Sequence, residues 1–340
     1  MKQTILVTGG AGYIGSHTVL ELLHQNHTVV VIDKVCSFQI NHPNVTYFQC
    51  DIADTPILKT ICARYTIDAV IHCAAFIEVG ASVVNPAAYY ENNVIKTVIF
   101  LETMRACSIT TIIFSSSAAV YGTPHTLPIP ETHSCNPISP YGKTKLIIEQ
   151  VLEDYRVAYS FKYRALRYFN ACGAYPEYHL GERHEPETHL IPRMLQAVID
   201  NAPFTLYGDD YETPDGTCVR DYVHVRDIAR AHRLALEHLQ ETGKSGVTNL
   251  GTTHGYSVKE IIQAVEQVTQ KKVIIQKMGR RAGDPAYLIA DTTQAKNLLN
   301  WQPQYSDIRL IVSSAYTFMQ QQSIDINRSM CSTTNTYQLG

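Results

Sequence analysis

The sequence lacks the features that mark several large classes of protein. None of its nine cysteines forms a Cys-x-x-Cys pair, and an odd number fits a disulfide framework poorly. The fourteen histidines show no His-Glu-x-x-His spacing, so we expect no structural metal and a reducing compartment. No apolar run approaches the roughly 18 residues of a membrane span, and a first strand beginning by about Thr4 leaves no room for a signal peptide. These absences favour a cytoplasmic protein.

Charge is also sparse. Only 17% of the 340 residues are charged and the formal net charge is -3, so we expect neither nucleic acid nor an anionic membrane surface as partner. With 45% hydrophobic residues the chain can bury an ordinary globular core. Its length suits two domains, or one large domain with an appended lobe.

What is present in the first half is a regular alternation of short apolar runs and helical patterns. Strands are expected at residues 4–8, 28–33, 45–51, 69–74, 111–117 and 161–167, with helices between them, including 57–65, 87–107 and 141–158. Continuous apolar strands alternating with helices predict an α/β fold with a parallel sheet covered on both faces, that is, a doubly wound sheet.

The rhythm changes beyond Asn170. A polar segment at 179–189 is followed by helices at 191–200, 225–239 and 257–269, a strand at 272–276 and a final helix near 310–320. This pattern predicts a smaller C-terminal α/β lobe. We expect a nucleotide-binding domain over residues 1–170 and a substrate-binding lobe over 171–340, with some of the chain crossing back to the first domain.

A glycine motif directly follows the first strand and opens a helix. Gly9, Gly12 and Gly15 stand in the Gly-x-x-Gly-x-x-Gly pattern that lets a backbone turn approach a pyrophosphate at a helix N-terminus. Asp33 ends the second strand, where a carboxylate accepts from the adenosine ribose hydroxyls and repels a 2′-phosphate. The pattern therefore predicts a Rossmann-type site that prefers NAD to NADP. The adjacent Lys34 weakens that preference.

Two other strand ends carry polar residues. Asp51, followed by Ile52, could contact the adenine edge, although a strand-capping acid is an equally good interpretation. Ser115 and Ser117 lie at the end of the fifth strand, the edge at which open α/β sheets meet their ligands. A serine hydroxyl there could bind a sugar hydroxyl, but serine is also common where strands end in turns.

Tyr141 and Lys145 are four residues apart and share one face of a predicted helix. A phenol with a pKa near ~10 is a poor base at neutral pH, and a close ammonium stabilises its phenolate and lowers that pKa. The pair is therefore a reasonable device for moving a proton on or off a hydroxyl. Alone it is weak evidence, because an exposed helix can carry both residues by chance.

Together these stretches resemble the UDP-glucose 4-epimerases (UDP-galactose 4-epimerases) of the extended short-chain dehydrogenase/reductase family, over about residues 2–320. The resemblance is carried by the segments Thr8–His17, Phe114–Gly122, Ser139–Lys145, Leu166–Asn170, Asp215–Val225 and Arg280–Pro285. Many relatives share any one of them, but the last two together point to the epimerases.

The resemblance implies a role for each matching residue. Tyr141 would be the acid/base, Lys145 its electrostatic partner, and Ser117 the sugar-orienting hydroxyl. The implied NAD contacts are Gly9, Gly12, Tyr13, Ile14, Gly15, Asp33, Asp51, Ile52, Ala74, Asn92, Ser115, Tyr141, Lys145 and Tyr168. The implied UDP-sugar contacts are Ser117, Tyr141, Asn170, Leu190, Tyr207, Arg220, Arg281, Asp284 and Leu288.

Some positions narrow the range of reactions that the family resemblance allows, and others differ from the family pattern. Ala118 and Ala119 offer no acid or base where dehydratases and decarboxylases of this family carry one, which favours epimerisation. Ile77 stands where epimerases often have a lysine near the cofactor pyrophosphate, and His189 where relatives have asparagine. Leu288 matches the sugar-pocket gate and leaves the acceptance of an N-acetyl group open.

The implied function is reversible 4-epimerisation of UDP-galactose and UDP-glucose through a transient 4-keto sugar, with bound NAD. The alternatives are a UDP-N-acetylglucosamine or UDP-pentose 4-epimerase on the same scaffold, or, more remotely, a non-catalytic NAD-sensing protein. A one-way reductase would need NADP turnover, which Asp33 disfavours. Relatives are usually homodimers through a helical face of the first domain, so a homodimer is expected here too.

Overall fold

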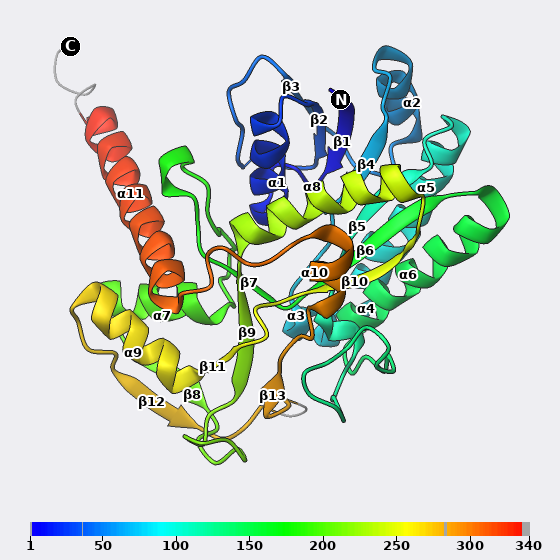
Figure 1. The fold of residues 1–340 in the computed structure, drawn as a ribbon. Helices are drawn as coiled ribbons and strands as arrows, with labels where there is room; N and C mark the ends of the chain where they lie inside the picture. The colour runs from blue at the N-terminus through cyan, green and yellow to red at the C-terminus, as the bar shows by residue number, and fades with distance from the viewer. Residues whose placement is uncertain (1, 36, 282–283, 335–340) are drawn as a thin grey trace, which may run out of the picture.

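A seven-stranded parallel sheet is the centre of the larger part of the molecule (Figure 1). The structure, a computed structural model, describes residues 2–35, 37–281 and 284–334. The strands lie in the order β10-β6-β5-β4-β1-β2-β3. Their bounds are β1 (Thr4–Thr8), β2 (Thr28–Asp33), β3 (Val45–Gln49), β4 (Ala69–His72), β5 (Thr111–Ser117), β6 (Lys162–Tyr168) and β10 (Gly246–Leu250). The predicted doubly wound Rossmann-type sheet is confirmed, and its switch point, where ligands bind in such sheets, lies between β1 and β4.

Helices cover both faces of this sheet because successive strand side chains point to opposite sides. Ile5 and Val7 of β1 pack on the face of α1 and α8, whereas Leu6 packs on the face of α2, α5 and α6. The first pair is α1 (Tyr13–His24) and α8 (Val225–Thr242); the second face carries α2 (Thr55–Arg64), α5 (Lys96–Ala106) and α6 (Pro140–Tyr159). Each face buries its own apolar core.

The helix expected over residues 87–107 contains an interruption. It consists of α4 (Pro86–Tyr90), a π-helical turn η1 (Glu91–Ile95) and α5, and a short helix α3 (Val79–Val84) precedes it. The π turn buries Asn93, whose amide accepts from Phe76 N at 2.8 Å and donates to Phe76 O at 2.9 Å and Thr144 Oγ1 at 3.2 Å. Such turns often occur at functional sites, and this one fixes the loop after β4 against α6.

The smaller lobe is built from two short sheets and three main helices, and lies at the bottom left of Figure 1. One sheet contains β7 (Asn170–Cys172), β9 (Val219–His224), β11 (Gly255–Ser257) and β13 (Tyr287–Leu288); the other pairs β8 (Phe204–Tyr207) with β12 (Ile275–Met278). The helices are α7 (Leu190–Ile199), α9 (Val258–Thr269) and α11 (Ile308–Thr334), with α10 (Thr293–Leu299) between the last two in sequence. The final helix is longer than the expected 310–320. Within the described residues no helix combines the length and apolar character of a membrane span.

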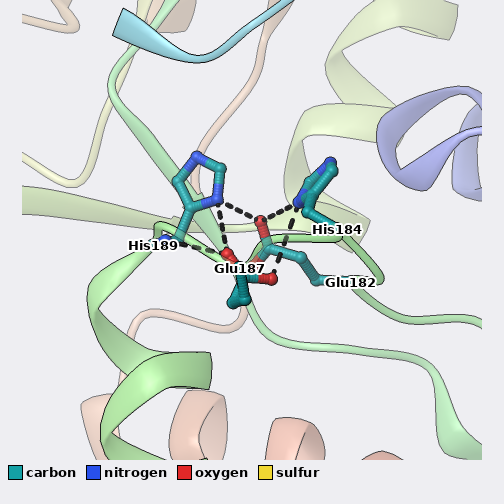
Figure 2. A group of neighbouring side chains, drawn as sticks. All are labelled: Glu182, His184, Glu187 and His189. Carbon is teal, nitrogen blue, oxygen red and sulfur yellow. Dashed lines mark hydrogen bonds and ion pairs between the residues drawn. The ribbon is translucent and has the colours of Figure 1, made fainter. Parts of the chain in front are cut away.

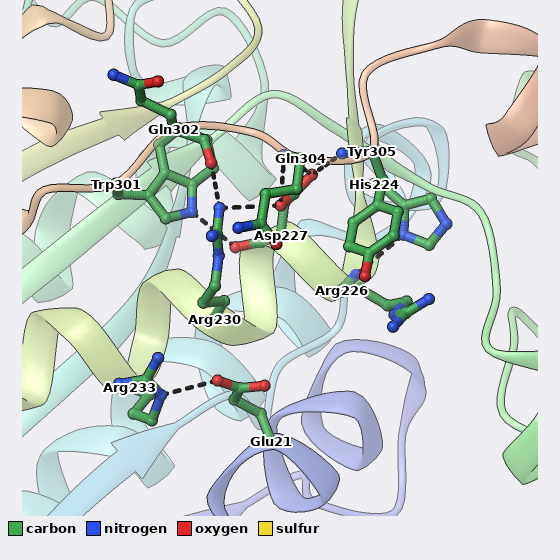
Figure 3. Close-up of polar contacts among 10 residues, drawn as sticks. All are labelled: Glu21, His224, Arg226, Asp227, Arg230, Arg233, Trp301, Gln302, Gln304 and Tyr305. Atoms are coloured by element: carbon green, nitrogen blue, oxygen red, sulfur yellow. Dashed lines mark hydrogen bonds and ion pairs between the residues drawn. The ribbon is translucent and has the colours of Figure 1, made fainter. Parts of the chain in front are cut away.

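A buried carboxylate joins the segment before α11 to α8 (Figure 3). Asp227, at the first turn of α8, is fully buried and accepts from Gln304 N at 2.9 Å and Tyr305 N at 2.8 Å. Trp301 Nε1 donates to the Asp227 carbonyl at 2.9 Å, and Arg230 pairs with the carboxylate at 3.2 Å. One buried acid therefore fixes the segment that leads into α11 against the first turn of α8.

Candidate active site

The glycine motif forms a tight turn between β1 and α1, beside the crevice at the sheet's switch point. Gly9 has a left-handed φ of 68°, which favours glycine, and its N–H donates to Ile32 O at 2.8 Å. A Cβ on Gly15 would lie 2.0 Å from Gly9 O, and one on Gly9 would lie 2.7 Å from Ala74 N. Because these glycines have no side chains, a ligand can come close to the backbone at the start of α1. The turn therefore fits a dinucleotide pyrophosphate.

The first residues of α1 tie this turn to the rest of the molecule. Gly12 N donates to Gly9 O at 3.1 Å, and Ile14 packs in the core beneath the helix. The Tyr13 hydroxyl donates to Gly173 O of the lobe at 2.6 Å. Since that hydroxyl is already used, Tyr13 would contact a cofactor through its backbone.

Asp33 lies at the end of β2 next to the glycine turn. Its carboxylate accepts from Ala11 N at 3.0 Å and Val35 N at 3.2 Å, and burial raises its pKa. Lys34 turns away and forms its ion pair with Asp51 at 3.1 Å and a hydrogen bond to Asn92 Oδ1 at 2.9 Å. The carboxylate keeps lone pairs for ribose hydroxyls, and the neighbouring lysine is engaged elsewhere.

Asp51 is held by two lysines. Besides Lys34, Lys96 reaches its Oδ2 at 2.7 Å, and Ala53 N donates to its Oδ1 at 2.9 Å. Burial tends to raise its pKa, but the two ammonium groups and the backbone N–H lower it to about 2. Asp51 therefore caps the end of its strand, with Ile52 buried beside it. A contact with adenine stays a prediction for both residues.

The catalytic candidates meet where β5 ends against α6. Ser139 caps this helix by accepting from Gly142 N at 3.1 Å, so Tyr141 lies in the first turn and Lys145 in the next. The Lys145 ammonium donates to Ser115 O at 2.8 Å and lies 5.8 Å from the centre of the Tyr141 ring. The Ser117 side chain lies close enough to the Tyr141 phenol to lower its pKa. The structure brings Ser117 next to the Tyr141 and Lys145 pair, which the sequence placed on one helix face.

Burial dominates the proton affinities of this centre. It raises the pKa of Tyr141 to about 12, against which the Ser117 hydrogen bond works, and it lowers the pKa of Lys145 to about 8. We expected the ammonium to lower the tyrosine pKa. In the protein alone the removal of water from the phenol is the largest influence and raises its pKa, because a buried phenolate loses its hydration.

The Ser115 residue, whose carbonyl binds Lys145, also makes several contacts through its hydroxyl. Its hydroxyl donates to Cys73 Sγ at 3.1 Å and lies 2.8 Å from His232 Nε2, and the Tyr168 hydroxyl hydrogen-bonds it. Burial lowers the pKa of His232 to about 4, which keeps the ring neutral. The sequence did not reveal His232 as a site residue. It belongs to α8, which comes from the second half of the chain and packs on this sheet, and no local sequence pattern distinguishes it.

A pocket in the smaller lobe collects several predicted substrate residues. Four of them line it: Leu190, Tyr207, Arg281 and Asp284. Its other lining residues, which sequence reasoning missed, are Thr188, Arg193, Phe204, Thr205, Leu206, Cys218 and Val258. The helical spacing of Leu190 and Arg193, three residues apart on one face of α7, is a signal that could have found the arginine.

Two arginines predicted to bind the diphosphate have different partners in the structure. The Arg281 guanidinium lies 4.1 Å from the centre of the Tyr207 ring, a cation–π contact that leaves its N–H groups for a ligand. Arg220 instead pairs with Asp284 and donates to Pro285 O at 2.7 Å. Ala282 and Gly283, which complete the quoted Arg280–Pro285 motif, lie outside the described residues.

Asn170 and Leu288 lie outside the lining of this cavity. Asn170 is exposed at the start of β7, where it pairs with Tyr222 of β9. Leu288 pairs in β13 with Arg220 and packs on an apolar cluster that includes Ala118 and Phe169. Because Ala118 directly follows Ser117, Leu288 borders the catalytic side of the substrate region.

Known proteins resemble this chain over nearly its whole length. Residues 5–251 match the model of the NAD dependent epimerase/dehydratase family. A UDP-glucose 4-epimerase of Halalkalibacterium halodurans is 47% identical over 94% of this chain and 96% of its own. The crystal structure of a UDP-glucose 4-epimerase from Brucella ovis in complex with NAD has a TM-score of 0.88 at 47% identity, covering 92% of this chain and 97% of that one. That from Bifidobacterium longum with NAD+ and UDP has a TM-score of 0.86 at 38% identity, covering 94% and 99%.

Proposed function

The chain belongs to the NAD dependent epimerase/dehydratase family, and we propose that it interconverts UDP-galactose and UDP-glucose by inverting the sugar at C4. One observation carries the proposal: Tyr141, Lys145 and Ser117 converge in a buried site beside a turn shaped for a dinucleotide. The 4-epimerases of other organisms, nearly half identical to this chain over almost their full length, support the same reaction.

Each residue has a task in this reaction. Tyr141 takes the proton of the sugar 4-hydroxyl, and Ser117 holds that hydroxyl toward the phenol. NAD, when bound at the glycine turn and Asp33, supplies a hydride acceptor and donor and a positive charge that favours the phenolate. Lys145 adds its ammonium one helical turn away, since burial leaves it few other partners.

Inversion requires that the 4-keto sugar present its other face while the nucleotide stays bound. The lobe cavity supports this, because Leu190 and Tyr207 line it for a planar base and Arg281 stands at its wall. Arg220 would exchange its Asp284 partner for diphosphate oxygens, which its planar fork can bind in pairs. Asn170 and Leu288 would contact the sugar between this anchor and Tyr141.

We further propose a cytoplasmic homodimer. No disulfide forms among the described cysteines Cys50, Cys62, Cys73, Cys107, Cys135, Cys172 and Cys218, which suits a reducing compartment. Ile95 and Ile99 around the start of α5 and Val157 on α6 are exposed apolar side chains that a partner's helices could cover. Sedimentation of the purified protein at one subunit mass would contradict the dimer.

The test is to incubate the purified protein with UDP-galactose, without added NAD, and to follow UDP-glucose with a coupled dehydrogenase. Product formation would establish the reaction and a resident cofactor. Offering UDP-N-acetylglucosamine and a UDP-pentose to the same preparation measures what Leu288 admits. If no product forms from UDP-galactose even with added NAD, the proposed substrate is wrong.

A further inference from the structure

Four side chains of the segment before α7 face one another (Figure 2). Glu182, His184, Glu187 and His189 each offer one nitrogen or oxygen atom, and these atoms all lie within 4.8 Å of one another. In Figure 2 the two imidazoles stand on opposite sides and the two carboxylates lie between them. The group shares no residue with the glycine turn or with the Tyr141 site, and the proposed reaction does not use it.

The distances match a compact coordination shell. His189 Nδ1 lies 2.8 Å from Glu182 Oε1 and 3.1 Å from Glu187 Oε1, and His184 Nδ1 lies 3.2 Å and 3.6 Å from the same two carboxylates. Tetrahedral zinc bonds of about 2.0–2.2 Å put neighbouring ligand atoms about 3.3 Å apart. Small side-chain shifts would therefore place an ion equally far from all four.

Hydrogen bonds satisfy only part of this arrangement: Glu187 Oε1 accepts from Thr188 N at 2.7 Å and His189 N at 2.8 Å. His184 Nδ1 is shielded from solvent but makes no hydrogen bond, although Glu182 Oε1 is close. The Glu182 side chain is only 7% exposed, and a second carboxylate shares its surroundings. Two carboxylates held together repel each other unless positive charge lies between them.

Protonated histidines are one source of that charge. A divalent ion supplies the same charge as two added protons. It also gives the unpaired Nδ1 of His184 a partner that the carboxylate geometry does not.

We propose that Glu182, His184, Glu187 and His189 bind one divalent transition-metal ion, with Zn²⁺ as the best fit. Two imidazole nitrogens disfavour Mg²⁺ and Ca²⁺, which prefer oxygen ligands, and four N/O ligands suit tetrahedral zinc. The side chains of His184 and His189 are 21% and 39% exposed, which gives the ion a route from solvent.

The ion would act on the adjacent helix. His189 is the residue before α7, and Thr188 and Leu190 line the lobe cavity. Binding by four residues of one short segment would fix where α7 begins and hold this wall of the cavity in place. Metal removal should then raise the KM for the UDP-sugar more than it lowers kcat. This consequence rests on the proposed function, whereas metal binding itself does not.

The direct test is calorimetric titration of the full-length protein with ZnCl2 after treatment with EDTA and dialysis. We expect one ion per chain and a higher Tm with the ion bound. Glu187→Gln and His184→Gln should each weaken binding by about 100-fold or more, because each removes a ligand. Glu185→Gln is the matched control: it makes the same chemical change at an exposed position of the same segment and should bind zinc as the wild type does.

Co²⁺ gives a second readout that does not depend on how the variants fold. A tetrahedral site of nitrogen and oxygen ligands predicts visible cobalt bands without a sulfur-to-cobalt charge-transfer band. The proposal is overturned if the wild type shows no saturable one-to-one binding of Zn²⁺ or Co²⁺. It is equally overturned if Glu187→Gln binds as tightly as the wild type, or if the cobalt spectrum shows thiolate ligation.

Discussion

Lys145 and Glu149 lie one turn apart on the buried face of α6, but their surroundings differ. Glu149 forms a buried ion pair with Arg167 of β6 and accepts from Ser116 of β5, and Arg167 also donates to Tyr121 at 3.0 Å. Lys145 donates to a single carbonyl, that of Ser115, and among the described residues no carboxylate forms an ion pair with it. The buried charge of Glu149 is therefore paired within the protein, whereas the buried charge of Lys145, one turn earlier, remains available to a ligand.

The difference explains how one helix can serve stability and chemistry. A paired buried charge holds β5, β6 and α6 in a fixed arrangement, whereas an unpaired one stays available and has a shifted pKa. Because both turns belong to the same rigid helix, the paired turn positions the reactive one. Substitutions at the two turns should therefore have separable effects on activity and on stability.

The largest effect is expected from Tyr141→Phe. This variant keeps the buried ring but loses the proton acceptor, so kcat should fall by roughly 10²–10⁴-fold while the Tm stays close to that of the wild type. Coupled turnover of UDP-galactose and thermal unfolding measure the two quantities. Near-normal turnover would remove Tyr141 from the mechanism.

Glu149→Gln should disrupt the buried ion pair between Glu149 and Arg167. It leaves the Arg167 guanidinium buried without its counter-ion, which should lower the free energy of unfolding by about 3–5 kcal/mol in a urea titration. Glu153→Gln, one turn further along α6, is the matched control. Its pair with Arg156 is exposed, so its loss should cost less than about 1 kcal/mol. Equal losses in the two variants would contradict the comparison.

Lys145→Met should affect activity without a loss of stability. Removal of the ammonium beside Tyr141 should lower kcat by roughly 10²–10³-fold, as for a preorganised electrostatic donor. The free energy of unfolding at pH 7 should stay the same or rise, since an unpaired buried charge is replaced by an apolar chain of similar length. A large fall in stability would mean that Lys145 belongs to the structural network instead.

The pH dependence of stability should identify the same lysine. Its folded pKa of about 8 lies below the ordinary 10.5, so between these values the unfolded chain binds more protons and stability rises with pH. The cost of the buried charge is complete below pH 8. The difference in unfolding free energy between wild type and Lys145→Met should therefore be largest there, of order 3 kcal/mol, and shrink toward pH 10.5. A difference that does not change with pH would show that the lysine pKa is not lowered.

Ser117→Ala should have the smallest effect. The serine contributes one hydrogen bond that lowers the Tyr141 pKa, so kcat should fall by about tenfold, equivalent to about 1.4 kcal/mol. The ascending limb of the pH–rate profile, on which the Tyr141 phenolate forms, should shift to higher pH in this variant. An unchanged profile with reduced turnover would leave Ser117 a role in orienting the sugar only.

Much of the larger part could be predicted because its signals are local. The bounds of β1, β2 and β5 agree with the expected strands to the residue, and the Tyr141 helix differs by one residue at either end. Apolar runs and capping residues act over a few positions, so they are readable without the fold. The lobe was harder: β8 and β9 were not expected as strands, because each pairs with distant segments in short sheets.

By itself the sequence determined the dinucleotide turn, the spacing of Tyr141 and Lys145 on one helix and the doubly wound sheet, since these depend on neighbours within a few residues. Only the tertiary structure decided that His232 approaches Ser115, that burial outweighs Lys145 at the Tyr141 phenol, and that Lys34 pairs with Asp51. It also decided that Glu182, His184, Glu187 and His189 face one another, where the histidine spacing had suggested no metal. The reason is physical: hydration, ion pairing and metal ligation depend on which atoms are brought within a few ångströms, and the folded chain settles those distances.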